Sequence, residues 1–121
     1  MVVPVVILQT NPVALQTSER CLTQAGFEWG VQFVAEFIPD AVGRHIKSGE
    51  RQLLITGTIR GDIESTVKFM EGAKRANPRV VVALFSVYPS TEGPHDLVIR
   101  KDGGYPELIE AVRKFLSAGI N

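Results

Sequence analysis

The chain has 121 residues, 45% of them hydrophobic, and its 13 lysines and arginines balance its 13 aspartates and glutamates. This length fits one domain, residues 1–121, and the apolar content is too high for an intrinsically disordered chain. The even charge, without runs of one sign, argues against a nucleic-acid-binding surface. No apolar run is long enough to span a membrane, and the start lacks the features of a signal peptide. We therefore expect a cytoplasmic protein that contacts neither nucleic acid nor membrane.

The predicted elements alternate between strand and helix. In chain order they are a strand at residues 2–8, a helix at 12–25, a strand at 31–36, a short helix at 39–47, a strand at 52–56, a helix from about 62 to 77, strands at 80–85 and 96–100, and a helix from 106 onward. The strand runs are apolar and rich in β-branched residues, which is typical of strands buried on both faces of a parallel sheet. This order predicts a doubly wound α/β domain.

Capping residues and apolar spacing define the helices. Asn11 is a favourable N-cap before Pro12, and Gly26 ends the first helix. The predicted inner stripes are Ile63, Val67, Met70 and Ala73 in the third helix, and Leu108, Val112, Phe115 and Leu116 in the last. Between residues 86 and 95, two prolines and a glycine disfavour a full helix.

Cysteine and histidine are scarce. Cys21 is single, so no internal disulfide can form, and we expect it to be a small buried hydrophobe. His45 and His95 are the only histidines and lack the paired spacing of metal ligands. A nearby serine with His95 and Asp96 could form a catalytic triad on paper, but no nucleophile-elbow sequence supports it. We therefore expect no metal, no cofactor and no enzymatic activity.

Polar residues without carboxylates follow the apolar strands. Gln9-Thr10, Thr56, Ser86 and Lys101 stand at the ends of four predicted strands. Because a doubly wound domain places its site at the carboxyl ends of its strands, we expect these residues to share one pocket. That pocket would offer an amine, hydroxyls and amides, but no acid.

Phosphate-loop motifs are weak in this chain. Residues 56–62 link a strand to a helix, where backbone N–H groups can bind phosphate, but the endings of a P-loop and of a dinucleotide-binding loop are missing. Residues 9–12 are a poor version of a flavin phosphate loop, because Pro12 has no N–H. A flavoprotein or a hydrolase is therefore less favoured than a binding domain.

The layout resembles the receiver domain of bacterial two-component response regulators over nearly the whole chain. The matching segments are residues 7–12, 25–27, 53–56 with Gly61, 84–86 and 98–101. The resemblance implies a flavodoxin-like (CheY-like) five-stranded parallel sheet with strand order 2-1-3-4-5. The short stretch between Ser86 and Lys101 implies that the fourth helix is shortened or replaced by a loop.

The departures from the receiver pattern concern its chemistry. The acidic pair that holds Mg²⁺ in receivers falls on Gln9 and Thr10, and the phosphoacceptor aspartate falls on Thr56. Mg²⁺ prefers anionic oxygen ligands, and a threonine cannot form an aspartyl phosphate. Ser86 and Lys101 match the two residues that contact the phosphoryl group in receivers. The resemblance therefore implies a degenerate receiver without the usual phosphotransfer.

Two functions follow as hypotheses. The first is a phosphorylation-independent pseudo-receiver, a protein–protein interaction module whose partner is another signalling protein or a second copy of the chain. The alternative is a small-anion or phosphometabolite site, formed by Asn11, Thr56, Thr58, Ser86 and Lys101.

Plainer roles are open for several of these residues. Lys101 could pair with Asp62 or Asp102, Ser86 could cap or turn the chain, and Asn11 could be only a helix cap. Tyr88 could anchor a partner or fold over the sheet.

Overall fold

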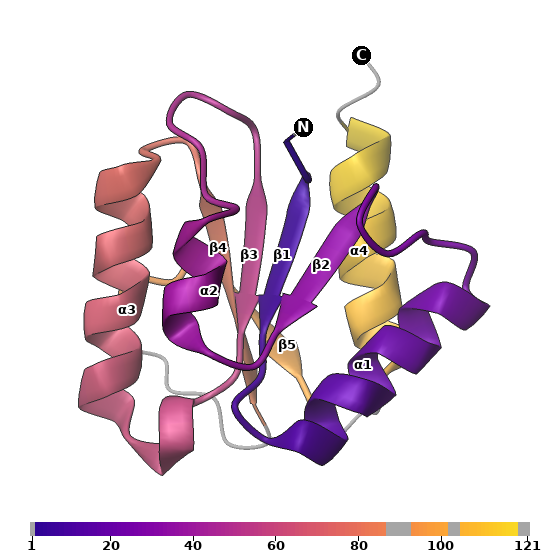
Figure 1. The fold of residues 1–121 in the computed structure, drawn as a ribbon, viewed down its shortest axis with the longest axis horizontal. Helices are drawn as coiled ribbons and strands as arrows, with labels where there is room; N and C mark the ends of the chain where they lie inside the picture. Colours follow the sequence, from indigo (N-terminus) through magenta and orange to yellow (C-terminus); the bar gives the residue numbers. More distant parts are fainter. Residues whose placement is uncertain (1, 87–92, 102–104, 119–121) are drawn as a thin grey trace.

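The computed structural model describes residues 2–86, 93–101 and 105–118 of the chain (Figure 1). In chain order the elements are β1 (Val5–Leu8), α1 (Pro12–Gln24), β2 (Phe33–Glu36), α2 (Pro39–Gly43), β3 (Leu53–Thr56), the 3₁₀ turn η1 (Ile59–Gly61), α3 (Ile63–Ala76), β4 (Val81–Ser86), β5 (Leu97–Arg100) and α4 (Pro106–Ala118). No helix among these residues has the length and hydrophobicity needed to cross a membrane.

The five strands form one parallel sheet in the order β2-β1-β3-β4-β5, which confirms the predicted topology. In the register, Leu8 of β1 lies between Glu36 of β2 and Thr56 of β3, and Thr56 lies beside Leu84 of β4. The strands therefore end together, at the lower edge of the sheet in Figure 1. The loops after β1 and β3 begin at this edge, where Ser86 of β4 and Lys101 after β5 also lie.

Helices cover both faces of the sheet (Figure 1). One buried cluster joins inward side chains of α1 and α4 to one face, and a second joins those of α2 and α3 to the other. The central strands are buried on both faces, as their continuous apolar runs predict. The prediction for the last helix is confirmed, because Leu108, Val112 and Phe115 are buried and Leu116 packs against them.

The inner stripe predicted for the third helix is wrong at one position. Met70 and Ala73 are buried, but Ile63 is 47% exposed. Thr66 is buried in this turn instead, and its hydroxyl donates to the carbonyl of Asp62 and accepts the N–H of Ile59. A polar residue is inward here because η1 packs against the start of α3 and has a donor to satisfy.

The connection from β4 to β5 is described only at residues 93–96, which form no helix. Residues 87–92, including Tyr88, lie outside the described part of the chain. In the edge strand β5, Val98 is 38% exposed. The edge strand β5 thus presents an apolar side chain to solvent.

Candidate functional site

A hollow opens at the carboxyl ends of the strands. It is lined by Gln9, Thr10, Asn11 and Pro12 after β1, by Thr58, Arg60 and Gly61 after β3, by Phe85 and Ser86 at the end of β4, and by Lys101 after β5. We call it the strand-end hollow. It brings together four of the five residues predicted for the anion pocket, because parallel strands end at one edge of the sheet. The fifth, Thr56, is elsewhere.

Thr56 lies beneath the hollow. Its side chain is fully buried, and its hydroxyl donates to the carbonyl of Gly57 at 2.8 Å. Among the residues that line the hollow, Thr56 is absent. Its inclusion in the predicted pocket is therefore wrong, since the last residue of a strand can point into the core as well as toward the loops.

Gln9 is the most buried polar side chain of the hollow. It is only 3% exposed, and its amide Nε2 is buried without a hydrogen-bond partner among the described residues. The amide lies against the backbone of Gly57, where an added Cβ would sit 2.6 Å from Oε1. Glycine at this position therefore leaves room for the Gln9 side chain. A buried amide donor without a partner is energetically costly.

Lys101 supplies one positive charge to the hollow. Its ammonium group lies 5.1 Å from the ring centre of Phe85, and the described part of the chain contains no carboxylate in ion-pair contact with it. Burial lowers the pKa of Lys101, since removal from water disfavours the charged form. The predicted pairing with Asp62 is wrong, because the Asp62 carboxylate caps α3 by accepting from Glu64 N at 3.1 Å and Ser65 Oγ at 2.6 Å. Asp102 lies outside the described residues.

Arg60 is a second cation in the hollow, and the sequence reasoning missed it. Its backbone is left-handed, with φ of 50°, and its N–H donates to Thr10 Oγ1 at 3.2 Å. Gly61 is left-handed as well, at φ 74°. These two residues turn the β3 loop sharply, so that it reaches the loop after β1. The sequence feature that could have identified Arg60 as a site residue is its position in the loop after a central strand.

Asn11 serves as the predicted cap. Its Oδ1 accepts the N–H groups of Val13 at 2.9 Å and Ala14 at 3.2 Å, which confirms the plainer role considered for it. Pro12 at the first helical position has no N–H to offer. The free donors at the start of α1 are therefore few, and the polarity of the hollow comes mainly from side chains.

Comparison with known proteins addresses the fold. No protein-family model matches the sequence, and no curated protein matches it. Solved structures do. A CheY-like response regulator receiver domain from Methanospirillum hungatei superposes with a TM-score of 0.72 at 16% identity, over 98% of this chain and 96% of that one. A response regulator from Thermotoga maritima gives 0.65 at 17% identity, over 97% and 99%.

A third similar structure is described as a pilus assembly protein (cpaE) from Burkholderia thailandensis. It gives a TM-score of 0.68 at 14% identity, over 95% of this chain and 98% of that one. The chain has the receiver fold. At these identities the likeness concerns the fold, and the site must be judged from its own residues.

In this receiver fold, the positions of the acidic cluster carry no acid. Gln9 and Thr10 line the hollow where the resemblance places the metal-binding pair, and Thr56 lies buried at the acceptor position. None of the described residues that line the hollow is acidic. Across the described residues, no three His, Cys, Asp or Glu side chains are grouped closely enough to hold a metal ion. The hollow thus offers donors and positive charge, which suit an anion better than Mg²⁺.

The geometry does not support the catalytic triad of a serine, His95 and Asp96 that the sequence analysis considered. The Asp96 carboxylate accepts from Lys74 Nζ at 2.8 Å and from Val82 N at 2.9 Å. Burial opposes ionisation of this carboxyl, but the Lys74 and Val82 hydrogen bonds and the Lys74 charge prevail and lower the pKa of Asp96. Asp96 therefore fixes α3 to the start of β5, and it does not orient His95.

Proposed function

We propose that the chain is a pseudo-receiver, a protein–protein interaction module of a cytoplasmic signalling or assembly complex that works without phosphorylation at its strand ends. The observation that carries this proposal is the state of Thr56. The resemblance to receivers assigns it the acceptor position, and it is fully buried with its hydroxyl bonded to Gly57. A phosphoryl group would need a carboxylate nucleophile and a bound cation, and the described residues around Thr56 provide neither.

The structural neighbours support a regulatory context. Two are response regulators, and a third is described as a pilus assembly protein. In this proposal the chain is not an enzyme, and it acts by contact with another protein of such a complex or with a second copy of itself. Function then depends on a surface rather than on a reaction.

The surface that we propose for this contact is the β5–α4 face. An apolar groove runs between the edge strand and the last helix, and Leu97 is 37% exposed along it. Glu107, Glu110 and Lys114 of α4 border the groove. Because the border carries both signs of charge, two copies related by a twofold axis can set lysine against glutamate. We therefore propose a second copy as the occupant.

Direct strand-to-strand pairing contributes little to this contact. The N–H of Arg100, near the end of β5, is bonded to Glu107 Oε2 at 3.0 Å, so α4 protects part of the strand edge. The proposed contact therefore relies on side-chain packing over Leu97.

Sedimentation equilibrium of the purified chain tests both parts of the proposal. We expect a monomer–dimer equilibrium that acetyl phosphate with Mg²⁺ leaves unchanged, and no phosphoryl adduct by mass spectrometry. Leu97→Glu should give a monomer, because it places a charge in the groove. Val31→Glu is the matched control, since Val31 is 46% exposed outside this face. A phosphoryl adduct would overturn the pseudo-receiver, and a wild-type chain that stays monomeric would overturn the second copy as occupant.

A further inference from the structure

The strand-end hollow concentrates positive charge in a chain without net charge. Its described lining contains Arg60 and Lys101 and no carboxylate, although the whole chain has as many acids as bases. Lys101 is taken partly out of water there, which is reflected in its lowered pKa. A cation that loses water without gaining a carboxylate is a cost to folding. An anion that enters the hollow would offset this cost.

Gln9 supplies an independent observation at the same place. Its side chain lines the hollow, is 3% exposed, and has an amide Nε2 without a hydrogen-bond partner among the described residues. Nearly all buried amides in folded proteins are paired, so an unpaired one at a polar hollow points to a missing acceptor. An anionic oxygen is the acceptor that such a donor binds most strongly.

We propose that the strand-end hollow binds a small phosphate-type oxyanion, either inorganic phosphate or the phosphate group of a small metabolite. The anion would occupy the region where the resemblance to receivers places a metal ion. The inference goes beyond the proposed interaction function and does not depend on it.

The side chains have distinct tasks in this site. Lys101 follows β5 and Arg60 follows β3, and both would give charge-assisted hydrogen bonds to the anion. Thr10 and Thr58 provide hydroxyl donors, of which Thr10 already accepts from Arg60 N and so keeps its proton for a ligand. Gln9 would donate its buried amide to the anion. Two cations and neutral donors around one point favour a dianionic tetrahedral group over a single carboxylate.

The start of α1 is not the binding element. Asn11 already occupies the N–H groups of Val13 and Ala14, and Pro12 has none. A phosphate held only by a helix N-terminus would therefore be insensitive to Lys101 and Arg60. Substitution of these two side chains distinguishes the two arrangements.

The test is titration of the full chain with sodium phosphate at constant ionic strength, followed by calorimetry and by the thermal midpoint of unfolding. We expect saturable binding and a rising midpoint in the wild type. Lys101→Met and Arg60→Met should each weaken binding by about tenfold or more, the range expected when one charge-assisted hydrogen bond is lost. Lys101→Arg should retain most of the affinity. Lys68→Met is the control, since Lys68 lies on the exposed face of α3 and pairs with Glu64.

Two further measurements identify the class of ligand and test whether the Gln9 amide contacts it. Glycerol phosphate should bind as phosphate does, and acetate should bind much more weakly. In ¹⁵N NMR spectra, the side-chain amide signals of Gln9 should shift on phosphate addition, and Gln9→Met should lose affinity while remaining folded. The site is overturned if phosphate gives no rise, or an equal rise in Lys101→Met. Leu97→Glu should bind phosphate like the wild type, so failure of the interaction surface leaves this result interpretable.

Discussion

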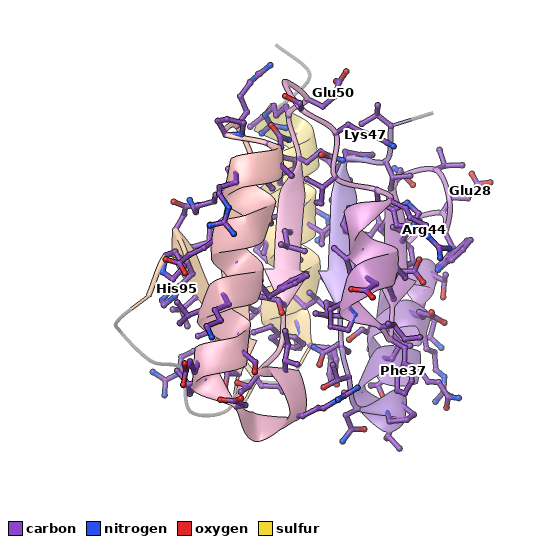
Figure 2. All side chains as sticks on the ribbon, turned by 60° about the vertical axis from the view of Figure 1, so that its left-hand side comes forward. Glu28, Phe37, Arg44, Lys47, Glu50 and His95 are labelled. Carbon is purple, nitrogen blue, oxygen red and sulfur yellow. The ribbon has the colours of Figure 1, made fainter. Side chains whose placement is uncertain are left out.

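Two buried glutamines lie at opposite ends of the sheet and are treated in opposite ways. Gln52 precedes β3 at the amino end and is fully buried. Its Nε2 donates to the carbonyls of Val3 at 3.0 Å and His45 at 2.6 Å, and its Oε1 accepts from Lys47 N at 2.9 Å and Asn77 Nδ2 at 3.1 Å. In Figure 2, Lys47 and Glu50 mark this end at the top of the molecule. The amino end is thus closed by a saturated network.

Gln9 follows β1 at the carboxyl end and is almost as buried, but its Nε2 is unpaired within the described part of the chain. Phe37, after β2, marks this end at the lower part of Figure 2 and is 46% exposed. Glutamine therefore has a structural role at the amino end, whereas at the carboxyl end the described residues offer its amide donor no hydrogen-bond partner. Folded chains leave such groups unsatisfied mainly where a ligand completes them.

The largest expected effect comes from removing the saturated amide. Gln52→Met keeps the size of the side chain but removes the partner of the Val3 and His45 carbonyls and of the Lys47 N–H, and one of the two acceptors of Asn77 Nδ2. We expect a loss of about 3 kcal/mol in the free energy of unfolding, measured by urea denaturation. The matched change Gln9→Met removes an amide that has no partner and should cost less than about 1 kcal/mol. Equal losses of unfolding free energy for the two variants would contradict the difference proposed between the paired Gln52 amide and the unpaired Gln9 amide.

A second, smaller effect tests how Gln9 is held. In Gly57→Ala, the new Cβ would sit 2.6 Å from Gln9 Oε1, so the buried amide must move, at a cost of about 1–2 kcal/mol. The same substitution in a Gln9→Ala background meets no such atom and should cost about 1 kcal/mol less. A double-mutant cycle by urea denaturation measures this coupling. Additive losses would mean that Gly57 does not position the amide.

The fold was predictable because its signals are local and agree with one another. The apolar run of β4 and the Asn11-Pro12 cap each indicate one structure, and the alternation of elements then leaves few topologies. Ends of elements were less predictable. The second strand begins at Phe33 rather than at Val31, and the short helix ends at Gly43 rather than near residue 47, since solvent and one glycine decide these boundaries.

Only those features of the site that follow from the sheet topology were predictable from the sequence. Asn11, Thr58, Ser86 and Lys101 meet because parallel strands end at one edge. The direction of the last side chain of a strand is not encoded by the topology, so the burial of Thr56 was missed. The contribution of Arg60 depends on a left-handed backbone that a non-glycine residue rarely adopts. The unpaired amide of Gln9 is a property of packing, and no sequence pattern indicates it.

The smallest expected effect comes from a comparison of two lysines. Lys74 is paired with a carboxylate, and Lys101 has no carboxylate partner among the described residues. Lys74 bonds Asp96, whose pKa is lowered, so this pair contributes stability that is present above the ordinary carboxyl value and is lost as the pH falls through the lowered one. Lys101 has a lowered pKa from burial alone. The unfolded chain then binds more protons than the folded chain in the alkaline range below 10.5, the ordinary value for lysine. Stability should therefore rise with pH in that range.

Urea midpoints measured across this alkaline range, in wild type and Lys101→Met, isolate the Lys101 effect. Burial raises the pKa of Tyr105, which gives a slope of the opposite sign, and the difference between the two proteins removes it. We expect the wild type to gain stability relative to the variant as the pH rises. Saturating phosphate should abolish this gain, because an anion beside Lys101 restores its affinity for the proton. A gain that phosphate leaves intact would place the charge of Lys101 outside the anion site, whereas its disappearance would place the amine of Lys101 in the same binding site as the Gln9 amide.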